Sequence, residues 1–303
     1  MIQFLYDYYL TRLNIDKKNN ISKRLEWYLY RYLKSALVNY YGHLSNKKIG
    51  IDENSNVVVS LTSFPARIHL VELAIKSILN QTYKPLKVVL WLGNEKFPKK
   101  EEELPESLLN LTKKGLEIEF CEDLKPHTKY FYAFKKYPNN LIVTVDDDIF
   151  YPNKMLEKLC ELYKKYPNCV IANRVREIKV TNGQFEVYRN WKINGIGHSN
   201  PSKKLLATGV GGVLYQPNLF KPCLLDVENL RRLAYITDDI WLKANGMHSQ
   251  ISVVFTNYFM KSFMEIPKSQ KENLHASNVF EGNNDLQIKA TFEYFGINEN
   301  SFD

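Results

Sequence analysis

The sequence predicts an α/β fold in which helices cover both faces of a mostly parallel central sheet. Short apolar runs alternate with helical periodicities through the first half of the chain, a pattern typical of parallel sheets. The last of these runs, residues 141–145, is continuous rather than alternating, which indicates a strand buried on both faces. With 303 residues, 45% of them hydrophobic, the chain can form a large core without disulfides or a structural metal.

The predicted elements of the first half follow in a regular order. Four strands are expected, at residues 57–61, 86–92, 116–121 and 141–145. Helical periodicity occupies the intervals between them, at residues 67–80, 101–114 and 128–136. Ligands of open α/β sheets bind beyond the carboxyl ends of the strands. The loops after residues 61, 92, 121 and 145 are therefore expected to carry the chemistry.

The second half has a more mixed pattern. Residues 175–188 are predicted to form a hairpin, because Asn182-Gly183 favours a tight primed turn. Residues 206–215 contain Thr208-Gly209-Val210-Gly211-Gly212, a strand or loop of small residues that permits close backbone approach. Residues 237–245 and 284–296 are predicted to be helical.

The positive charge of the chain is concentrated at its N-terminus. Lys and Arg number 41 against 33 Asp and Glu, a net +8, and residues 1–49 hold nine bases and three acids, or 9 − 3 = +6. The rest of the chain is nearly neutral, which argues against a nucleic-acid groove. Residues 21–41 predict an amphipathic helix that is rich in tyrosine and basic residues. This helix either packs on the body or lies at an anionic membrane surface.

Composition also indicates a compartment. The four cysteines form no CxxC pair, which favours a reducing environment over a disulfide or zinc framework. The N-terminus is a poor secretory signal, and no uncharged apolar stretch is long enough to span a membrane. We expect a cytoplasmic protein. A more specific interpretation is that it attaches peripherally to the inner face of the cytoplasmic membrane.

The strongest chemical signal is the triplet Asp146-Asp147-Asp148, directly after the predicted strand 141–145. Three adjacent carboxylates repel one another and need a cation. Alternate residues at a strand end project to one side, so Asp146 and Asp148 are predicted to share one Mn or Mg ion. The alternative is an acidic turn before the next helix, which a single Asp would satisfy.

Weaker signals accompany the triplet. Asp238 or Asp239 is expected to cap a helix, which leaves the other carboxylate available as a general base. Basic residues that follow predicted strands are further candidates, for binding a diphosphate, and one histidine is the best candidate for an additional metal ligand. These residues are Arg67, Lys125, Lys129 and His275. No GxGxxG, Walker, GxSxG or HExxH motif is present, which weakens dehydrogenase, kinase-like and common hydrolase interpretations.

From about residue 57 to residue 296 the order of these motifs resembles the bacterial nucleotide-sugar glycosyltransferases of the GT-A fold, related to family 2. The resemblance rests on the segments 60–68, 77–85 and 135–138, the Asp triplet, Gly209 to Tyr215, and Thr237 to Trp241. It implies an extension over residues 1–52 and a GT-A domain over 53–303, with a nucleotide half at 57–150 and an acceptor half at 151–300. The triplet then looks like a DxD motif, and the pair 238–239 resembles the acceptor-side catalytic carboxylates.

The resemblance implies sugar transfer from a nucleoside-diphosphate sugar, with UDP expected, to a glycan or lipid-linked glycan hydroxyl at the bacterial surface (capsule or lipopolysaccharide). The resemblance implies nucleotide contacts by Thr62, Phe64, Arg67, Lys129, Asp146 and Asp147. It implies contacts with the donor sugar or the acceptor by Gly211, Gly212 and Trp241. It also implies metal ligation by Asp146, Asp148 and His275, and catalysis by Asp239 and Asp238. Inversion and retention of the anomeric configuration both stay open. The rival classes are a sugar-phosphate nucleotidyltransferase and a non-catalytic, membrane-associated glycan-binding module.

Overall fold

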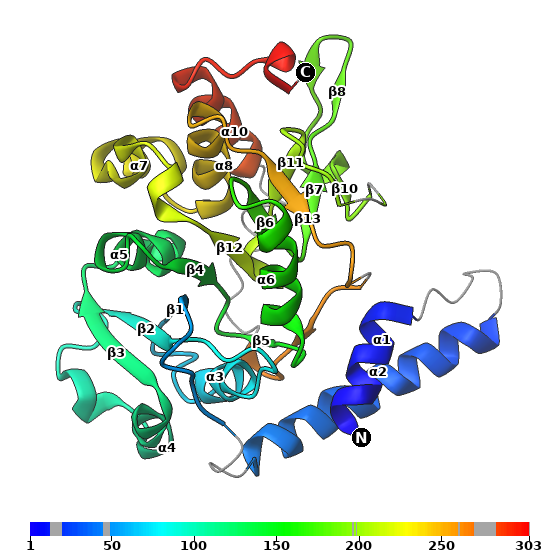
Figure 1. Ribbon diagram of the computed structural model, residues 1–303, viewed down its shortest axis with the longest axis vertical. Helices are drawn as coiled ribbons and strands as arrows, with labels where there is room; N and C mark the ends of the chain where they lie inside the picture. The colour runs from blue at the N-terminus through cyan, green and yellow to red at the C-terminus, as the bar shows by residue number, and fades with distance from the viewer. Residues whose placement is uncertain are drawn as a thin grey trace.

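The structure, a computed structural model, describes residues 1–12, 20–44, 49–195, 197, 199–259, 261–269 and 283–302. A seven-stranded sheet crosses its centre (Figure 1), in the strand order β13-β6-β12-β4-β1-β2-β3. The strands of this sheet are β1 (Val57–Ser63), β2 (Lys87–Gly93), β3 (Leu116–Cys121), β4 (Leu141–Thr144), β6 (Val170–Ala172), β12 (Val213–Tyr215) and β13 (Val253–Phe255). All neighbours pair in parallel except β12, which is antiparallel to both β4 and β6. The predicted mostly parallel sheet is confirmed.

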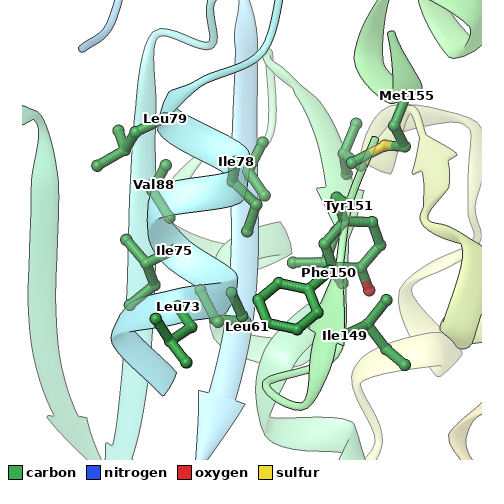
Figure 2. Close-up of a cluster of buried hydrophobic side chains, with 14 of the residues drawn as sticks. Leu61, Leu73, Ile75, Ile78, Leu79, Val88, Ile149, Phe150, Tyr151 and Met155 are labelled. Atoms are coloured by element: carbon green, nitrogen blue, oxygen red, sulfur yellow. The ribbon is translucent and has the colours of Figure 1, made fainter. Parts of the chain in front are cut away.

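Helices cover both faces of this sheet. They are α3 (Val71–Leu79), α4 (Glu106–Leu109), α5 (Thr128–Lys136), α6 (Met155–Lys165), α7 (Val227–Ala234), α8 (Asp238–His248) and α10 (Asn283–Tyr294). Side chains alternate between the faces along each strand: Val57 and Val59 join the apolar cluster under α3 and α6, whereas Val58 joins the cluster under α5 and α7. Figure 2 shows part of the first cluster, where Leu61 lies beside Phe150.

One local prediction was wrong, and one was confirmed only at its turn. Residues 101–114 are not one helix but three short turns, η1 (Lys100–Glu103), α4 and η2 (Asn110–Lys114), because Pro105 holds Leu104 in an extended conformation. The hairpin is confined to β8 (Val180–Thr181) and β9 (Gln184–Phe185), with Asn182 and Gly183 both at positive φ as a primed turn requires. The strand β7 (Val175–Glu177) pairs instead with β10 (Lys192–Ile193) and β11 (Leu205–Ala207). A last pair, β5 (Ile149–Phe150) with β14 (Met264–Glu265), lies directly after the Asp triplet.

The N-terminal residues form two adjacent helices at one side of the molecule, α1 (Ile2–Arg12) and α2 (Asn20–Gly42) (Figure 1). Their inner faces share the core of the body, because Tyr6, Leu37 and Tyr41 are fully buried in the cluster that contains Phe150. The Tyr6 hydroxyl donates to the Phe150 carbonyl at 2.7 Å and accepts from the Met264 amide at 2.9 Å. The helical extension is therefore a packed part of the fold.

Candidate active site

A cavity of about 530 Å³ opens at the carboxyl edge of the central sheet, where the sequence predicts the chemistry. Residues that follow β1, β2, β3, β4 and β6 line it, together with the start of α8. The Asp triplet and the pair Asp238-Asp239 lie in this one cavity, although about 90 residues separate them in the sequence. The fold thus brings the two predicted acidic clusters together.

Two of the triplet's carboxylates share one arginine. The Arg67 Nη1 atom lies 2.8 Å from Asp147 Oδ1 and 2.9 Å from Asp148 Oδ2. The Ser63 hydroxyl donates to the other Asp147 oxygen at 2.5 Å. Burial raises the pKa of Asp147 in spite of these partners, and although burial also opposes the charge of Arg67, the two carboxylates raise the pKa of the guanidinium. Asp147 is only 6% exposed, so its interactions are chiefly with its own chain.

Lys129 connects the two acidic clusters. Its ammonium lies 2.8 Å from Asp146 Oδ1 and 3.1 Å from Asp238 Oδ2. The side chain is buried, and burial disfavours its charge, yet Asp146 and Asp238 raise the pKa of Lys129 well above its ordinary value. An ammonium on α5 is thereby held charged between a carboxylate that follows β4 and one that begins α8.

Asp239 has a different environment from Asp238. One of its oxygens accepts a hydrogen bond from the Gly209 amide at 3.2 Å. Burial, followed by repulsion from Asp238, raises the pKa of Asp239 well above its ordinary value, against the opposing influence of Lys129. A carboxylate with a raised pKa holds a proton more strongly, which suits a general base.

The strands β1 to β3 supply one end of the cavity. Thr62, Phe64, Lys96 and Asp123 all line it. Two cations lie near the Phe64 ring, with the Arg67 guanidinium carbon 5.2 Å and the Lys96 ammonium 5.8 Å from its centre. Lys96 also pairs with Asp123 at 2.7 Å. This end combines an aromatic surface with hydrogen-bonding and cationic groups, and the assignment of these residues to a nucleotide stays a prediction.

Three predicted sugar-contact residues do not line the cavity. Trp241 is fully buried, and its indole nitrogen donates to the Leu224 carbonyl at 2.9 Å. Gly211 packs against backbone, since a Cβ there would lie 3.0 Å from the Arg174 nitrogen. Gly212, at φ +82°, packs against Met155. Among the described residues that line the cavity, Gly209 is the only glycine.

The cavity also contains residues that the sequence analysis did not select. Arg174, Arg176 and Tyr188 also line it. A signal for Arg174 existed, because it follows the apolar run Val170–Ala172 at the carboxyl end of a strand. We did not predict that strand, and no local pattern places Tyr188 beside it.

The oxygen-bearing side chains of the Asp triplet are of the type that binds a divalent cation. Asp146 and Asp148 line the same cavity, and carboxylate oxygens are the ligands that Mg and Mn prefer. In the structure Lys129 and Arg67 neutralise them, and no cluster of three or more metal-ligating side chains occurs within the described ranges. His275, the third predicted ligand, lies outside the described residues. A cation here would complete its shell with ligand oxygens and water.

The chain is similar to known proteins in part of its sequence and in its fold. Residues 66–214 match the sequence model of glycosyl transferase family 2. The mannosyltransferase PcManGT from Pyrobaculum calidifontis, solved with GDP-Man and Mn²⁺, has a TM-score of 0.51 at 11% identity, over 97% of this chain and 75% of that chain. TarS 1–349 from S. aureus has a TM-score of 0.43 at 12% identity, over 68% of this chain and 59% of that chain. This chain therefore spans less than two thirds of the TarS structure. No curated protein sequence matches it.

Proposed function

From the premise that this chain is a family 2-like glycosyltransferase of the GT-A fold, we propose that it moves a sugar from a nucleoside-diphosphate sugar to a hydroxyl of a bacterial surface glycan. One observation carries the proposal: Lys129 joins a carboxylate of the Asp triplet to a carboxylate at the start of α8 within one cavity. The groups that bind the donor and the groups that activate the acceptor would then lie close enough for one sugar to contact both. We propose UDP as the nucleotide.

The donor is assigned to the end of the cavity formed by β1 to β3. Phe64 offers a ring for the base, and Thr62 and Asp146 offer oxygens for the ribose. Arg67 and Lys129 supply positive charge close to the diphosphate. Asp147 would act indirectly, by orienting Arg67 through their 2.8 Å contact. Since the guanidinium already contacts Asp148 at 2.9 Å, it would have to share that carboxylate with any bound cation.

We assign a Mn or Mg ion to Asp146 and Asp148. When bound, such an ion neutralises the charge that develops on the departing diphosphate. Lys129 would keep Asp146 ionised and directed into the cavity, while Arg67 would do the same for Asp148. His275 stays a candidate for the third ligand.

Asp239 is assigned as the base that removes the acceptor proton while the acceptor oxygen attacks the anomeric carbon, if the reaction inverts. The Gly209 amide fixes one oxygen of Asp239. Asp238, tied to Lys129, would set the electrostatic field around it. If the reaction retains configuration, Asp239 would instead position the acceptor hydroxyl, and the leaving diphosphate would take the proton.

The test combines binding and turnover. A thermal-shift screen of UDP, GDP and their sugar conjugates, with Mn and with EDTA, should identify the donor through a stabilisation that needs the metal. Asp239→Asn should keep that stabilisation and lose donor hydrolysis and transfer by at least about a hundredfold. Asp226→Asn, an N-cap substitution on α7 outside the cavity, is the matched control. Full turnover in Asp239→Asn would remove it as the base, and no stabilisation by any sugar nucleotide would refute the proposal.

We further propose that the outer face of the N-terminal helices contacts an anionic membrane. Large apolar side chains are exposed there, including Phe4 at 73%, Leu25 at 62% and Tyr28 at 63%. Arg24 and Arg31 are exposed on the same helix as Leu25 and Tyr28. Aromatic groups beside basic ones suit the headgroup region of an anionic bilayer. In the part of the chain that the structure covers, no helix is both long and apolar enough to cross a bilayer.

Because the same helices contribute to the core, point variants test this proposal better than a truncation. The double variant Leu25→Ser/Tyr28→Ser should reduce flotation with vesicles that contain anionic phospholipid, and added salt should reduce flotation of the unchanged chain. Leu286→Ser removes a side chain that is 68% exposed on α10 and should have no effect. Equal flotation of all three proteins would leave the N-terminal helices as a packing element only.

A further inference from the structure

Two arginines at one end of the cavity have no role in the proposed function. Arg174 follows β6, and Arg176 lies in β7 with 7% of its surface exposed. Among the described residues, no carboxylate oxygen lies within 4.0 Å of either guanidinium, whereas Arg67 has two such partners. Two neighbouring, largely buried cations without an ion-pair partner are unfavourable unless an anion joins them.

Neutral groups hold both side chains in place. Arg176 Nη1 donates to the Trp191 carbonyl at 3.0 Å, and its guanidinium lies 4.5 Å above the centre of the Tyr188 ring. Arg174 Nη1 donates to the Thr208 hydroxyl at 3.2 Å. The Nε atoms of both arginines are buried and have no hydrogen-bond partner in the described part of the chain. Burial is the main cause that lowers the pKa of Arg174, and the charge of Arg176 adds to it, against the opposing influence of Tyr188, Asp239 and Asp146.

The sheet order fixes where this pair lies. Thr62 lies near the end of β1 and Lys96 follows β2, on one side of the Asp triplet that follows β4. Arg174 follows β6, which lies beyond β12 on the other side of β4. The residue after Thr208, the hydroxyl partner of Arg174, is Gly209, whose amide binds Asp239. Arg174 and Arg176 therefore lie on the side of the Asp triplet opposite the end assigned to the nucleotide, and Thr208-Gly209 connects Arg174 to the assigned base.

We propose that Arg174 and Arg176 bind an anionic group of the acceptor glycan, a carboxylate or a phosphate, next to the hydroxyl that attacks. This inference rests on the proposed function for the identity of the ligand as an acceptor. A planar guanidinium recognises both kinds of anion through paired hydrogen bonds. The Tyr188 ring, fixed against Arg176, offers an apolar surface for the sugar that carries the anion. The acceptor would then be an acidic or phosphorylated glycan, not a neutral one.

The experiment uses the full chain and small probes of known charge. Dissociation constants of glucuronate, glucose 6-phosphate and neutral glucose are measured by ligand-observed NMR, and those of UDP and GDP with Mn are measured in parallel. The proteins are the unchanged chain, Arg174→Gln, Arg174→Lys and, as a matched control, Arg189→Gln, which removes an exposed cation from the neighbouring segment. Thermal melting of each variant verifies that it folds.

We expect at least one acidic sugar to bind the unchanged chain more tightly than glucose. Arg174→Gln should weaken that binding by at least about tenfold, because a charge-assisted hydrogen bond is lost. Arg174→Lys should recover part of it, and Arg189→Gln should match the unchanged chain. Selectivity for glucuronate would identify a carboxylate and selectivity for glucose 6-phosphate a phosphate, and either result supports the proposal.

Two results would overturn the inference. The first is equal binding of acidic and neutral sugars by the unchanged chain. The second is a loss of UDP or GDP affinity in Arg174→Gln as large as the loss of acidic-sugar affinity, which would assign the arginines to the donor. If acidic sugars bind through Arg174 while no nucleoside diphosphate binds at all, the anion site stands and the proposed glycosyl transfer fails.

Discussion

Replacement of Lys129 by glutamine tests the electrostatic centre of the site. The substitution leaves Asp146 and Asp238 without their shared cation, at side-chain exposures of 26% and 11%. Removal of one partner from a buried ion pair costs about 3–5 kcal/mol, because the remaining charge stays desolvated. The partial exposure of Asp146 favours the lower end, so we expect a loss of about 3 kcal/mol in the free energy of unfolding. For a chain of this length that corresponds to a fall of about 5 °C in Tm.

The same helix provides a matched control. Lys136, also on α5, lies 3.5 Å from Glu117 and 2.6 Å from Glu119, but its side chain is 43% exposed. Exposed pairs contribute only about 0–1 kcal/mol, so Lys136→Gln should lower the free energy of unfolding by less than about 1 kcal/mol. Urea titrations at neutral pH measure both losses. Equal losses in the two variants would refute the reasoning, since burial is what distinguishes the two lysines.

Lys129→Gln should also change the pH profile of turnover. Lys129 is the cation that opposes the rise in the pKa of Asp239. Without it, that pKa should rise further, and Asp239 should bind a proton at higher pH. The acidic limb of the kcat profile should therefore move to higher pH, whereas Lys136→Gln should leave it in place. An unmoved limb would mean that Asp239 does not limit turnover as a base.

Three further predictions concern stability and packing. Burial lowers the pKa of His127 to about 4 from 6.5, so between these pH values the histidine is neutral in the folded protein and protonated in the unfolded chain. The free energy of unfolding should therefore fall by on the order of 3 kcal/mol as the pH is lowered from 6.5 to 4. Urea titration should show a smaller fall in His127→Gln. Tyr6→Phe leaves two buried backbone groups without their partner and should cost about 1–3 kcal/mol in chemical denaturation. Gly211→Ala would place a Cβ 3.0 Å from the Arg174 nitrogen; we expect a loss of about 1–3 kcal/mol by the same assay, together with weaker acidic-sugar binding.

The sequence was informative where a pattern has a local cause. The strand 116–121, the continuous apolar run 141–145 and the helix 128–136 appear within one residue of their predicted bounds. The Asp triplet and the pair 238–239 were both placed at the ends of elements, and the fold brings them into one cavity. The carboxyl-edge rule for open sheets explains the place of the triplet, which directly follows β4. It does not explain the place of the pair, which begins α8 and follows another helix.

The sequence did not predict the position of a side chain where that position depends on contacts with distant segments. Trp241 follows the acidic pair directly, yet it is a core residue, because the helix that begins with Asp238 turns it inward against Leu224. The partners of Lys129 could not be read from its own segment, since they are supplied by two other loops. The role proposed for Arg174 depends on the place of β6 in the sheet, where the antiparallel strand β12 separates it from β4. No local sequence pattern predicts this strand order.

The placement of the N-terminal helices connects the two proposed surfaces of the molecule. Composition suggested an appendage, since residues 1–49 hold most of the net charge. In the structure the Tyr6 hydroxyl binds the backbone of β5 and β14, and the Ile266 amide donates to the Asp148 carbonyl at 2.6 Å. The helix that exposes Phe4 thus also supports the loop that carries the Asp triplet. A bilayer that bound the outer face would therefore hold the cavity in one fixed orientation, and a lipid-linked, anionic acceptor would approach it from a constant direction.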